Sequence, residues 1–308
     1  MPFTEKFKIL LDKKLNQIEV EQYEDLTKRE AMIPQIFKEV DDPSAWWEYA
    51  SINGFGDIPS FGGSLEYLDN SPGYMTRIEP AEFAAGAIMD RKLIDAKKWP
   101  VLDDMASMLM DSAFRTRETK AAGVFGKGFS TAFDFMSYSE ENVALFSSSH
   151  TSKSGAPTTT GFDNYSTDAL NEISLEKMRI KMNRVRRDDG ARAFTNFDTL
   201  IVPDSLAKMA YEITQTPKGL HTANGTENFQ HGRWNVIVYK LQDDYSTKNW
   251  FIADSKMLKK HMMWINAVKW ETKRSFEDFE TLAIKTRIYG RWGYGWTNWR
   301  CVAGSQVS

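Results

Sequence analysis

Residues 284–296 read IKTRIYGRWGYGW, a run in which apolar or aromatic side chains recur at alternate positions apart from Thr286 and Gly290. Only an extended strand places alternate residues on one face, so the run predicts a long β-strand with two unlike faces. The expected core face consists of Ile284, Ile288, Gly290, Trp292, Tyr294 and Trp296. The opposite face, a basic and partly aromatic surface, consists of Lys285, Arg287, Tyr289, Arg291 and Gly293. The runs MMWINAVKWETKR and NWRCVAG on either side are typical of further strands.

The bulk composition excludes several classes of protein. With 308 residues, 42% of them hydrophobic and 26% charged, the chain can bury a full core and form two compact parts. A net charge of −3 excludes a surface built throughout to coat nucleic acid, so any contact with DNA must be local. No apolar run is long enough for a membrane span, and the segment MPFTEKFKILLDKK lacks the apolar stretch of a signal peptide. We therefore expect the protein to stay in the compartment where it is made.

The sequence patterns of catalytic and metal sites are missing or incomplete. The four histidines stand in HTSKS, HTANG, HGRWN and HMMWI, none of which is a zinc-binding H-E-x-x-H pair. His150 and His221 are expected to be solvated or locally hydrogen-bonded. The segment AAGVFGKGF lacks the first glycine and the final Ser or Thr of a phosphate-binding loop, and its glycines suggest a helix C-cap. The single cysteine, Cys301, excludes an internal disulfide and is expected in the core. We predict no catalytic, metal-binding or cofactor-binding residue and no cofactor, although carboxylate pairs leave no mark in a single sequence and stay open.

Two segments of the first 90 residues predict structures that need a partner surface. After a helical start, Pro34, Pro43 and Pro59 interrupt any regular element in residues 1–60, which predicts an extended arm. Its apolar anchors are expected to pack on a neighbouring subunit, with the chain's own core as the alternative: Ile33, Ile36, Phe37, Trp46, Trp47 and Tyr49. In residues 61–90, Pro72 and Gly73 suit the centre of a type II turn and predict a long hairpin, which is marginal in water on its own.

Two amphipathic helices are predicted further along. In residues 100–122, Pro100 fits the first turn, and the expected buried stripe is Val101, Met105, Met108 and Leu109. A Ser/Thr-rich loop at 147–167 would join the two parts of the chain. The second helix places Leu175, Met178, Met182 and Val185 on its buried stripe. Its basic stripe, Lys177, Lys181 and Arg184, is either a plain solvated face or a surface that faces DNA.

Taken in order, these segments resemble the major capsid protein of tailed bacteriophages, the head-shell fold of double-stranded DNA phages. The resemblance covers nearly the whole chain and rests on AMIPQIFKEV, GFGDIPSF, IEPAEFAAGAIMDRKLID, LFSSSH with LNEISLEKM, TLIVPDSLAKMA, NWFIADS and RIYGRWGYGWTNWRCVAGS. It implies an α+β fold with an N-terminal arm (1–60), an extended β-hairpin loop (61–90), a peripheral domain with a long spine helix (91–150), an axial α/β domain (151–259) and return strands of the peripheral domain (260–308).

The resemblance implies a structural subunit without catalysis that self-assembles into the icosahedral or prolate shell around phage double-stranded DNA. The implied partners are further copies in hexamers and pentamers, portal and scaffolding proteins, and the packaged DNA by non-specific contact, with no membrane. The implied location is the virion, after synthesis in the host bacterial cytoplasm. The candidate contacts between subunits are Trp46, Trp47, Leu68, Asn70, Tyr74, Arg287 and Arg291.

Two other functions remain open from the residues alone. A nucleic-acid-binding protein could use the Trp/Arg strand as a stacking platform, and a carbohydrate-active enzyme could line a sugar cleft with the same aromatic side chains. Neither alternative explains the long arm and the hairpin.

Overall fold

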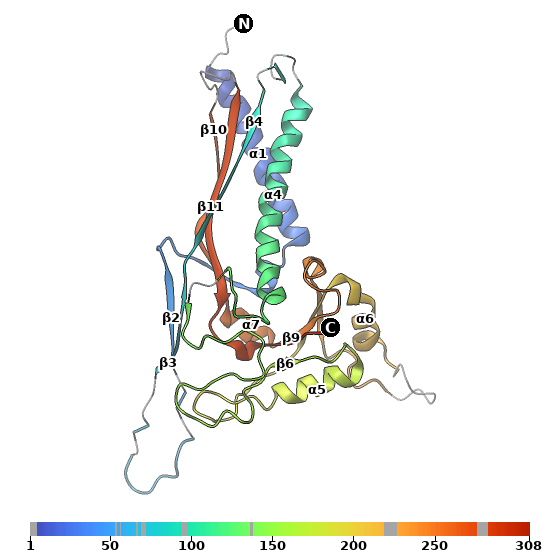
Figure 1. Cartoon of the computed structure of the whole chain (residues 1–308). Coiled ribbons are helices and arrows are strands. Elements are labelled where there is room, and N and C mark those ends of the chain that lie inside the picture. The colour runs from blue at the N-terminus through green and yellow to red at the C-terminus, as the bar shows by residue number, and fades with distance from the viewer. Residues whose placement is uncertain are drawn as a thin grey trace.

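The computed structural model describes residues 5–52, 54–55, 57–65, 67–68, 72–90, 92–93, 96, 98–135, 138–218, 227–275 and 283–308. It has an elongated part, in which two long helices run along a long sheet, and a compact α/β part at one end (Figure 1). Helix and sheet together confirm the expected α+β class.

The long sheet has the strand order β1-β10-β11-β4, from β1 (Lys38–Asp41), β10 (Met262–Ser275), β11 (Ile284–Trp296) and β4 (Ala81–Met89). Strand β11 pairs antiparallel with both β10 and β4, and β1 pairs parallel with β10. Burial alternates along β11 from Ile284 to Trp292, which confirms the predicted strand and its core face.

The basic face of β11 ends earlier than predicted. Gly293 is buried, and a Cβ added there would stand 2.7 Å from a methyl carbon of Ile78 and 3.2 Å from the Cα of Pro80. The chain that leads into β4 crosses the strand at this point, so from Gly293 onward both faces of β11 are covered. The prediction that Gly293 belongs to the exposed face is therefore wrong.

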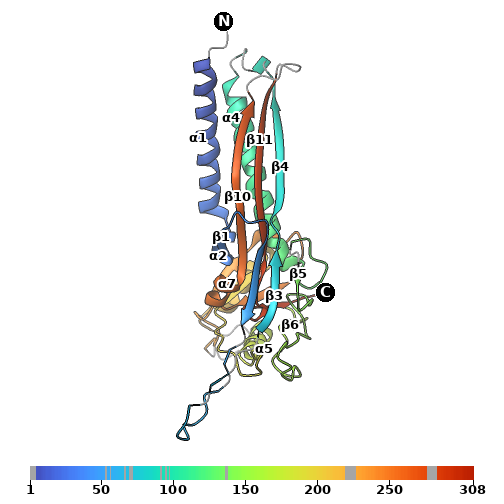
Figure 2. The ribbon, with the colours of Figure 1, turned by 90° about the vertical axis from the view of Figure 1, so that its left-hand side faces the viewer.

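Helix α4 (Trp99–Gly126) lies along the long sheet with α1 (Glu5–Glu30) beside it (Figure 2). Pro100 stands in the first turn of α4, as predicted. The buried stripe, however, is Leu102, Ala106, Met110 and Ala113, whereas the predicted Val101 and Met108 are 43% and 65% exposed. Ala106 packs against α1, and Met110 with Ala113 packs against Ile288 of β11. Because alanine side chains are small, α1 and β11 can approach the helix closely. The hydrophobicity of the sequence alone did not show that small residues are needed on this face.

The glycines at the end of α4 let the side chain of Tyr245 pack closely against the helix. Gly123 and Gly126 both lie within α4, and a Cβ added at Gly126 would stand 2.2 Å from the ring of Tyr245. A side chain at this position would displace Tyr245. The predicted role of these glycines as a helix C-cap is therefore wrong for Gly123 and Gly126.

The first half of the arm packs on its own chain. Ile33 and Ile36 of α2 (Ile33–Ile36) and the following Phe37 are at most 1% exposed and belong to the main core. The carboxylate of Glu118 in α4 accepts hydrogen bonds from the backbone N–H groups of Met32 at 3.1 Å and Ile33 at 3.4 Å. The expectation that these anchors need a neighbouring subunit is wrong, because this buried carboxylate holds the backbone of the arm against α4.

A third sheet forms the projecting hairpin, with the order β2-β3-β5 from β2 (Trp47–Ile52), β3 (Pro72–Ile78) and β5 (Tyr138–Ser139). Pro72 pairs with Ile52, so Pro72 and Gly73 lie in a strand, and the predicted turn is wrong. The hairpin therefore consists of β2, β3 and the residues between them. The expected loop boundaries of 61–90 are also wrong, because β4 belongs to the long sheet, where Phe83 stacks on Trp292 with ring centroids 4.1 Å apart.

The compact part is built on a sheet of order β6-β12-β9-β7-β8. Its strands are β6 (Tyr165–Ser166), β12 (Val302–Ser305), β9 (Trp250–Ala253), β7 (Thr199–Val202) and β8 (Asn235–Val238). Its helical elements are α5 (Glu172–Met182), η1 (Asp204–Leu206), α6 (Ala207–Gln215), η2 (Lys240–Gln242), α7 (Ser255–His261) and η3 (Trp299–Cys301).

The structure bears out the buried stripe of α5 for Leu175, Met178 and Met182, which are at most 2% exposed, whereas Val185 is buried but lies after the end of the helix. Cys301 is fully buried, as expected of a core residue. Residues 302–305 form β12, which pairs with β9 and β6. The expectation that all of 260–308 returns to the long sheet is therefore wrong for its last strand.

Replacing Trp292 by alanine tests the core face of β11. Trp292 is 3% exposed and meets Phe83 and Trp270, the latter with ring centroids 4.5 Å apart. Trp292→Ala should lower the free energy of unfolding by about 3–5 kcal/mol, because it leaves a large cavity. Arg287→Ala, on the exposed face of the same strand, should change it by less than about 0.5 kcal/mol. Urea unfolding of both variants measures the difference, and equal losses would refute the assigned faces.

Glu118 should make stability depend on pH. Burial raises the pKa of Glu118 from its ordinary 4.5 to about 7, so the folded protein holds this proton where the unfolded chain has lost it. The stability gained from the protonated form, on the order of 3 kcal/mol, is present at low pH and is lost as pH rises from about 4.5 to about 7. Glu118→Gln cannot titrate, so wild type should lose stability relative to this variant across that window. Urea unfolding at several pH values measures the difference in unfolding free energy between wild type and the variant. A difference that does not change with pH would contradict the raised pKa of Glu118.

Candidate functional site

Two of the described histidines, His150 and His261, are packed within the fold. His150 is 2% exposed, stacks on Trp299 with ring centroids 3.9 Å apart, and lies between Glu141 Oε1 at 3.0 Å and Asn164 Oδ1 at 3.1 Å. It is thus locally hydrogen-bonded but not solvated. Burial lowers the pKa of His261 to about 4, and its Nδ1 lies 2.9 Å from Thr297 Oγ1. His221 lies outside the described residues.

Metal and membrane sites receive no support from the described part of the chain. No group of three or more His, Cys, Asp or Glu side chains there is arranged to hold a metal ion. None of the helices described is both long and apolar enough to cross a membrane.

The structure places the predicted contact residues of the arm and the hairpin in different environments. Trp46 is 50% exposed, with the Arg77 guanidinium 4.8 Å from its ring centroid. Trp47 is half-buried and stacks on Tyr49. Tyr74 is half-buried in β3, and its hydroxyl lies 2.7 Å from Thr151 Oγ1 of the same chain. Leu68 is half-buried, and Asn70 lies outside the described residues.

Arg287 and Arg291 stand on the same side of β11 but differ in their contacts. Arg287 is exposed. Arg291 is half-buried, and its guanidinium donates to the backbone carbonyl of Pro43 at 2.8 Å and of Ser44 at 3.5 Å. Arg291 therefore holds the link between β1 and β2 within its own chain. Sequence reasoning missed this role because a backbone carbonyl carries no residue-type signal.

A row of exposed apolar side chains marks the loop that connects β2 and β3. This extended loop is defined by Phe55, Ile58, Phe61, Leu65 and Tyr67, which are 54%, 89%, 75%, 75% and 91% exposed. Figure 2 shows the loop reaching beyond the strands of the hairpin. Arg187 donates a 2.9 Å hydrogen bond to the carbonyl of Phe55 and so fixes one root of the loop to the compact part. Apolar groups gathered on a projection of this kind are typical of a protein–protein contact.

The exposed apolar row of this loop differs from the contact residues that sequence reasoning chose, whose role in contacts between subunits stays a prediction. Sequence reasoning chose Leu68, Asn70 and Tyr74 around the supposed turn, whereas the exposed apolar row precedes them. The spacing of apolar residues among glycines in GFGDIPSFGGSLEY was the available signal.

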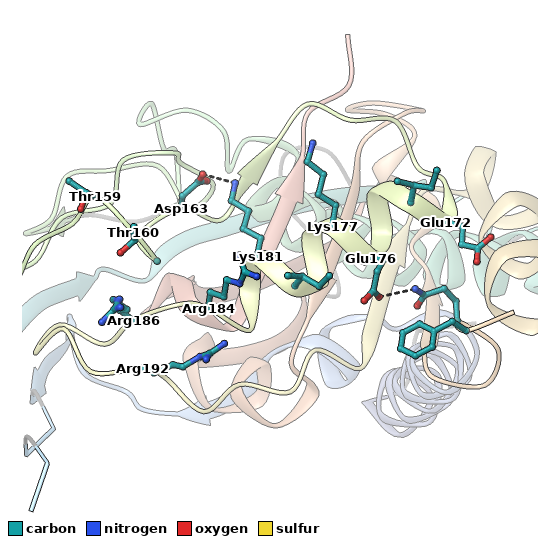
Figure 3. A pocket seen from close by; sticks show the side chains of 15 residues that line it. Thr159, Thr160, Asp163, Glu172, Glu176, Lys177, Lys181, Arg184, Arg186 and Arg192 are labelled. Carbon is teal, nitrogen blue, oxygen red and sulfur yellow. Dashed lines mark hydrogen bonds and ion pairs between the residues drawn. The ribbon is translucent and has the colours of Figure 1, made fainter.

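A groove of about 1300 Å³ runs along α5 in the compact part (Figure 3). We call it the basic groove; its cationic residues are Lys177, Lys181, Arg184, Arg186 and Arg192, and its apolar residues include Ile173, Ile180 and Phe229. Two of the predicted cations are neutralised, since Lys177 pairs with Asp168 at 2.8 Å and Lys181 with Asp163 at 2.5 Å. The hydrogen bond from Lys177 lowers the pKa of Asp168 below its ordinary value.

Comparisons with known proteins point to one family. Residues 73–305 match a family model described as phage capsid protein. No curated protein sequence matches the chain.

Several solved structures share the fold at low sequence identity. The capsid of an empty GTA particle is 11% identical, with 90% of each chain covered and a TM-score of 0.56. The capsid of Ralstonia phage GP4 is 10% identical, with 87% of each chain covered and a TM-score of 0.54. The mature capsid of bacteriophage PhiM1 is 11% identical over 90% of this chain and 87% of that chain, with a TM-score of 0.53.

Proposed function

The chain belongs to the phage capsid protein family, and from this membership we infer how its surfaces serve a phage head shell. It is a structural major capsid protein, and the family places it in the virion. The observation that carries this conclusion is the match of residues 73–305 to the family model, on a fold shared with capsids. No comparison favours the stacking platform or the carbohydrate-active enzyme.

We propose that copies of the subunit associate through the extended loop. Its apolar side chains contact little of their own chain, while its root is held by Arg187 and by the hairpin strands. Such a projection on one subunit meets a different surface on the next, and a contact between unlike surfaces repeats around a ring. Hexamers and pentamers are the expected rings, with Trp46 and Arg287 as further contact candidates because both side chains are exposed.

The remaining partners follow from the shell role. Portal and scaffolding proteins and packaged double-stranded DNA belong to this proposal, as does synthesis in the host bacterial cytoplasm. The subunit's contribution is structural, without catalysis.

The first test of the proposal is assembly of the purified wild-type protein. We expect sedimentation and electron microscopy to show shells, tubes or rings at high protein concentration, because the extended loop then finds its partner surface. A protein that stays strictly monomeric at every salt and crowding condition, even with a scaffolding partner, would count decisively against a shell role.

The second test removes the apolar side chains of the extended loop. Replacing Phe55, Ile58, Phe61, Leu65 and Tyr67 with serine should abolish particles while changing the stability of the unassembled subunit by less than about 0.5 kcal/mol, because exposed side chains contribute little to folding. The control Ser60→Asn with Ser64→Asn alters the same loop but keeps its apolar row, and it should still assemble. Normal particles from the five-serine variant, or an unfolded subunit, would show that the loop is not a contact between copies.

A further inference from the structure

Three arginines gather at one end of the basic groove. Arg184 follows α5, and the backbones of Arg186 and Arg192 pair as an isolated antiparallel bridge, which brings their side chains to the same end. Figure 3 shows these arginines near Thr159 and Thr160, while Glu172 and Glu176 lie toward the other end of the groove. We call Arg184, Arg186 and Arg192 the arginine cluster.

The charges of the arginine cluster are not neutralised by the described part of the chain. None of its three residues forms an ion pair with a described carboxylate. Arg186 donates to the carbonyl of Gly190 at 2.8 Å and Arg192 to the carbonyl of Asn183 at 2.9 Å, so backbone dipoles orient two guanidinium groups without cancelling their charge. All three side chains are exposed.

Several other cations of the groove and of the long sheet are paired within the chain. Lys181 pairs with Asp163, Lys269 with Asp41 at 2.6 Å and Lys273 with Glu271 at 4.0 Å. On β11, Arg291 is held by backbone carbonyls. In a chain of net charge −3, the arginine cluster is therefore a local positive surface that attracts an anion.

The chemistry of the cluster favours phosphate groups. A guanidinium group presents paired N–H donors that match two oxygens of one phosphate, and the exposed hydroxyls of Thr159 and Thr160 add donors beside them. Three such groups at one end of an open groove suit a chain of phosphates, as in a nucleic-acid backbone. Contacts of this type position a nucleic acid without reading its sequence.

We propose that the arginine cluster binds the phosphate backbone of double-stranded DNA without sequence preference. This inference rests on the proposed function, because it assigns residues to the contact between a shell subunit and packaged DNA. Of the basic stripe that the sequence left open as a DNA-facing surface, it keeps Arg184 and adds Arg186 and Arg192.

The test is binding of the unassembled full-length subunit to a fluorescent duplex of about 20 base pairs, a length chosen to span more than one helical turn. Wild type should bind, and the logarithm of its affinity should fall with the logarithm of salt concentration at a slope of about −2.7, for three phosphates at about 0.9 each. The triple variant Arg184→Ala, Arg186→Ala, Arg192→Ala should lose at least about tenfold in affinity at 50 mM salt and most of that slope.

A matched control removes the same charge from the long sheet. Lys273→Ala, Lys285→Ala, Arg287→Ala should leave both affinity and slope near those of wild type, and circular dichroism melts should show that both triple variants fold. Loss of binding in this control but not in the arginine variant would overturn the inference and return the DNA contact to β11.

Particle formation, scored by electron microscopy of the same proteins, separates this inference from the proposed function. A wild type that forms shells but binds no duplex at 50 mM salt overturns the inference alone. An arginine variant that binds DNA normally but forms no particles also overturns it, and would make the cluster a contact with carboxylates of a second copy.

Discussion

The architecture depends on the packing of aromatic rings where β4, β10 and β11 meet. Trp292 of β11 stacks on Phe83 of β4 and meets Trp270 of β10 edge to face. Trp264 of β10 stacks on Tyr294 with ring centroids 5.0 Å apart. Aromatic pairs combine a large buried area with a preferred geometry, so they fix the register of the strands that carry them. Because β11 leads through η3 into β12 of the compact sheet, this register also sets where the compact part stands.

Polar contacts then tie the N-terminal segment to this frame. The side chain of Arg274 in β10 is 1% exposed and pairs with Asp12 at 2.9 Å and with Glu19, both from α1. Removing one member of such a pair leaves a buried charge without its partner, which is strongly destabilising. Together with Glu118 and Arg291, these contacts hold the arm to its own chain. The extended loop, by contrast, keeps a row of apolar side chains exposed.

The sequence predicted what depends on local periodicity. Alternation identified β11 and its core face as far as Trp292, and helical spacing identified the buried stripe of α5. The predictions failed where a distant segment decides the environment. Ile78 and Pro80 cover Gly293, and α1 with β11 selects Ala106 and Ala113 over the more hydrophobic Met108. Pro72 and Gly73 carry a turn signal, yet pairing with β2 holds them in a strand. The arginine cluster was partly visible, through Arg184, but the bridge that brings Arg186 and Arg192 together has no sequence signature.

The proposed loop contact would let a stable subunit assemble reversibly. Full burial of one large apolar side chain contributes about 1.5–3 kcal/mol, but association also loses the translational and rotational freedom of two bodies, on the order of 4–15 kcal/mol. The contact between one extended loop and one neighbouring subunit is therefore weak, although the side chains of the loop are apolar. Under the proposed contact, a subunit in a closed shell would give its loop to one neighbour and receive the loop of another, so each further contact would be made without a second loss of that freedom. When each single contact is weak, a misplaced subunit can dissociate. A subunit in the closed shell is held by several contacts at once and stays bound. This behaviour requires that the loop contribute little to the subunit's own fold, and its exposed side chains meet that condition.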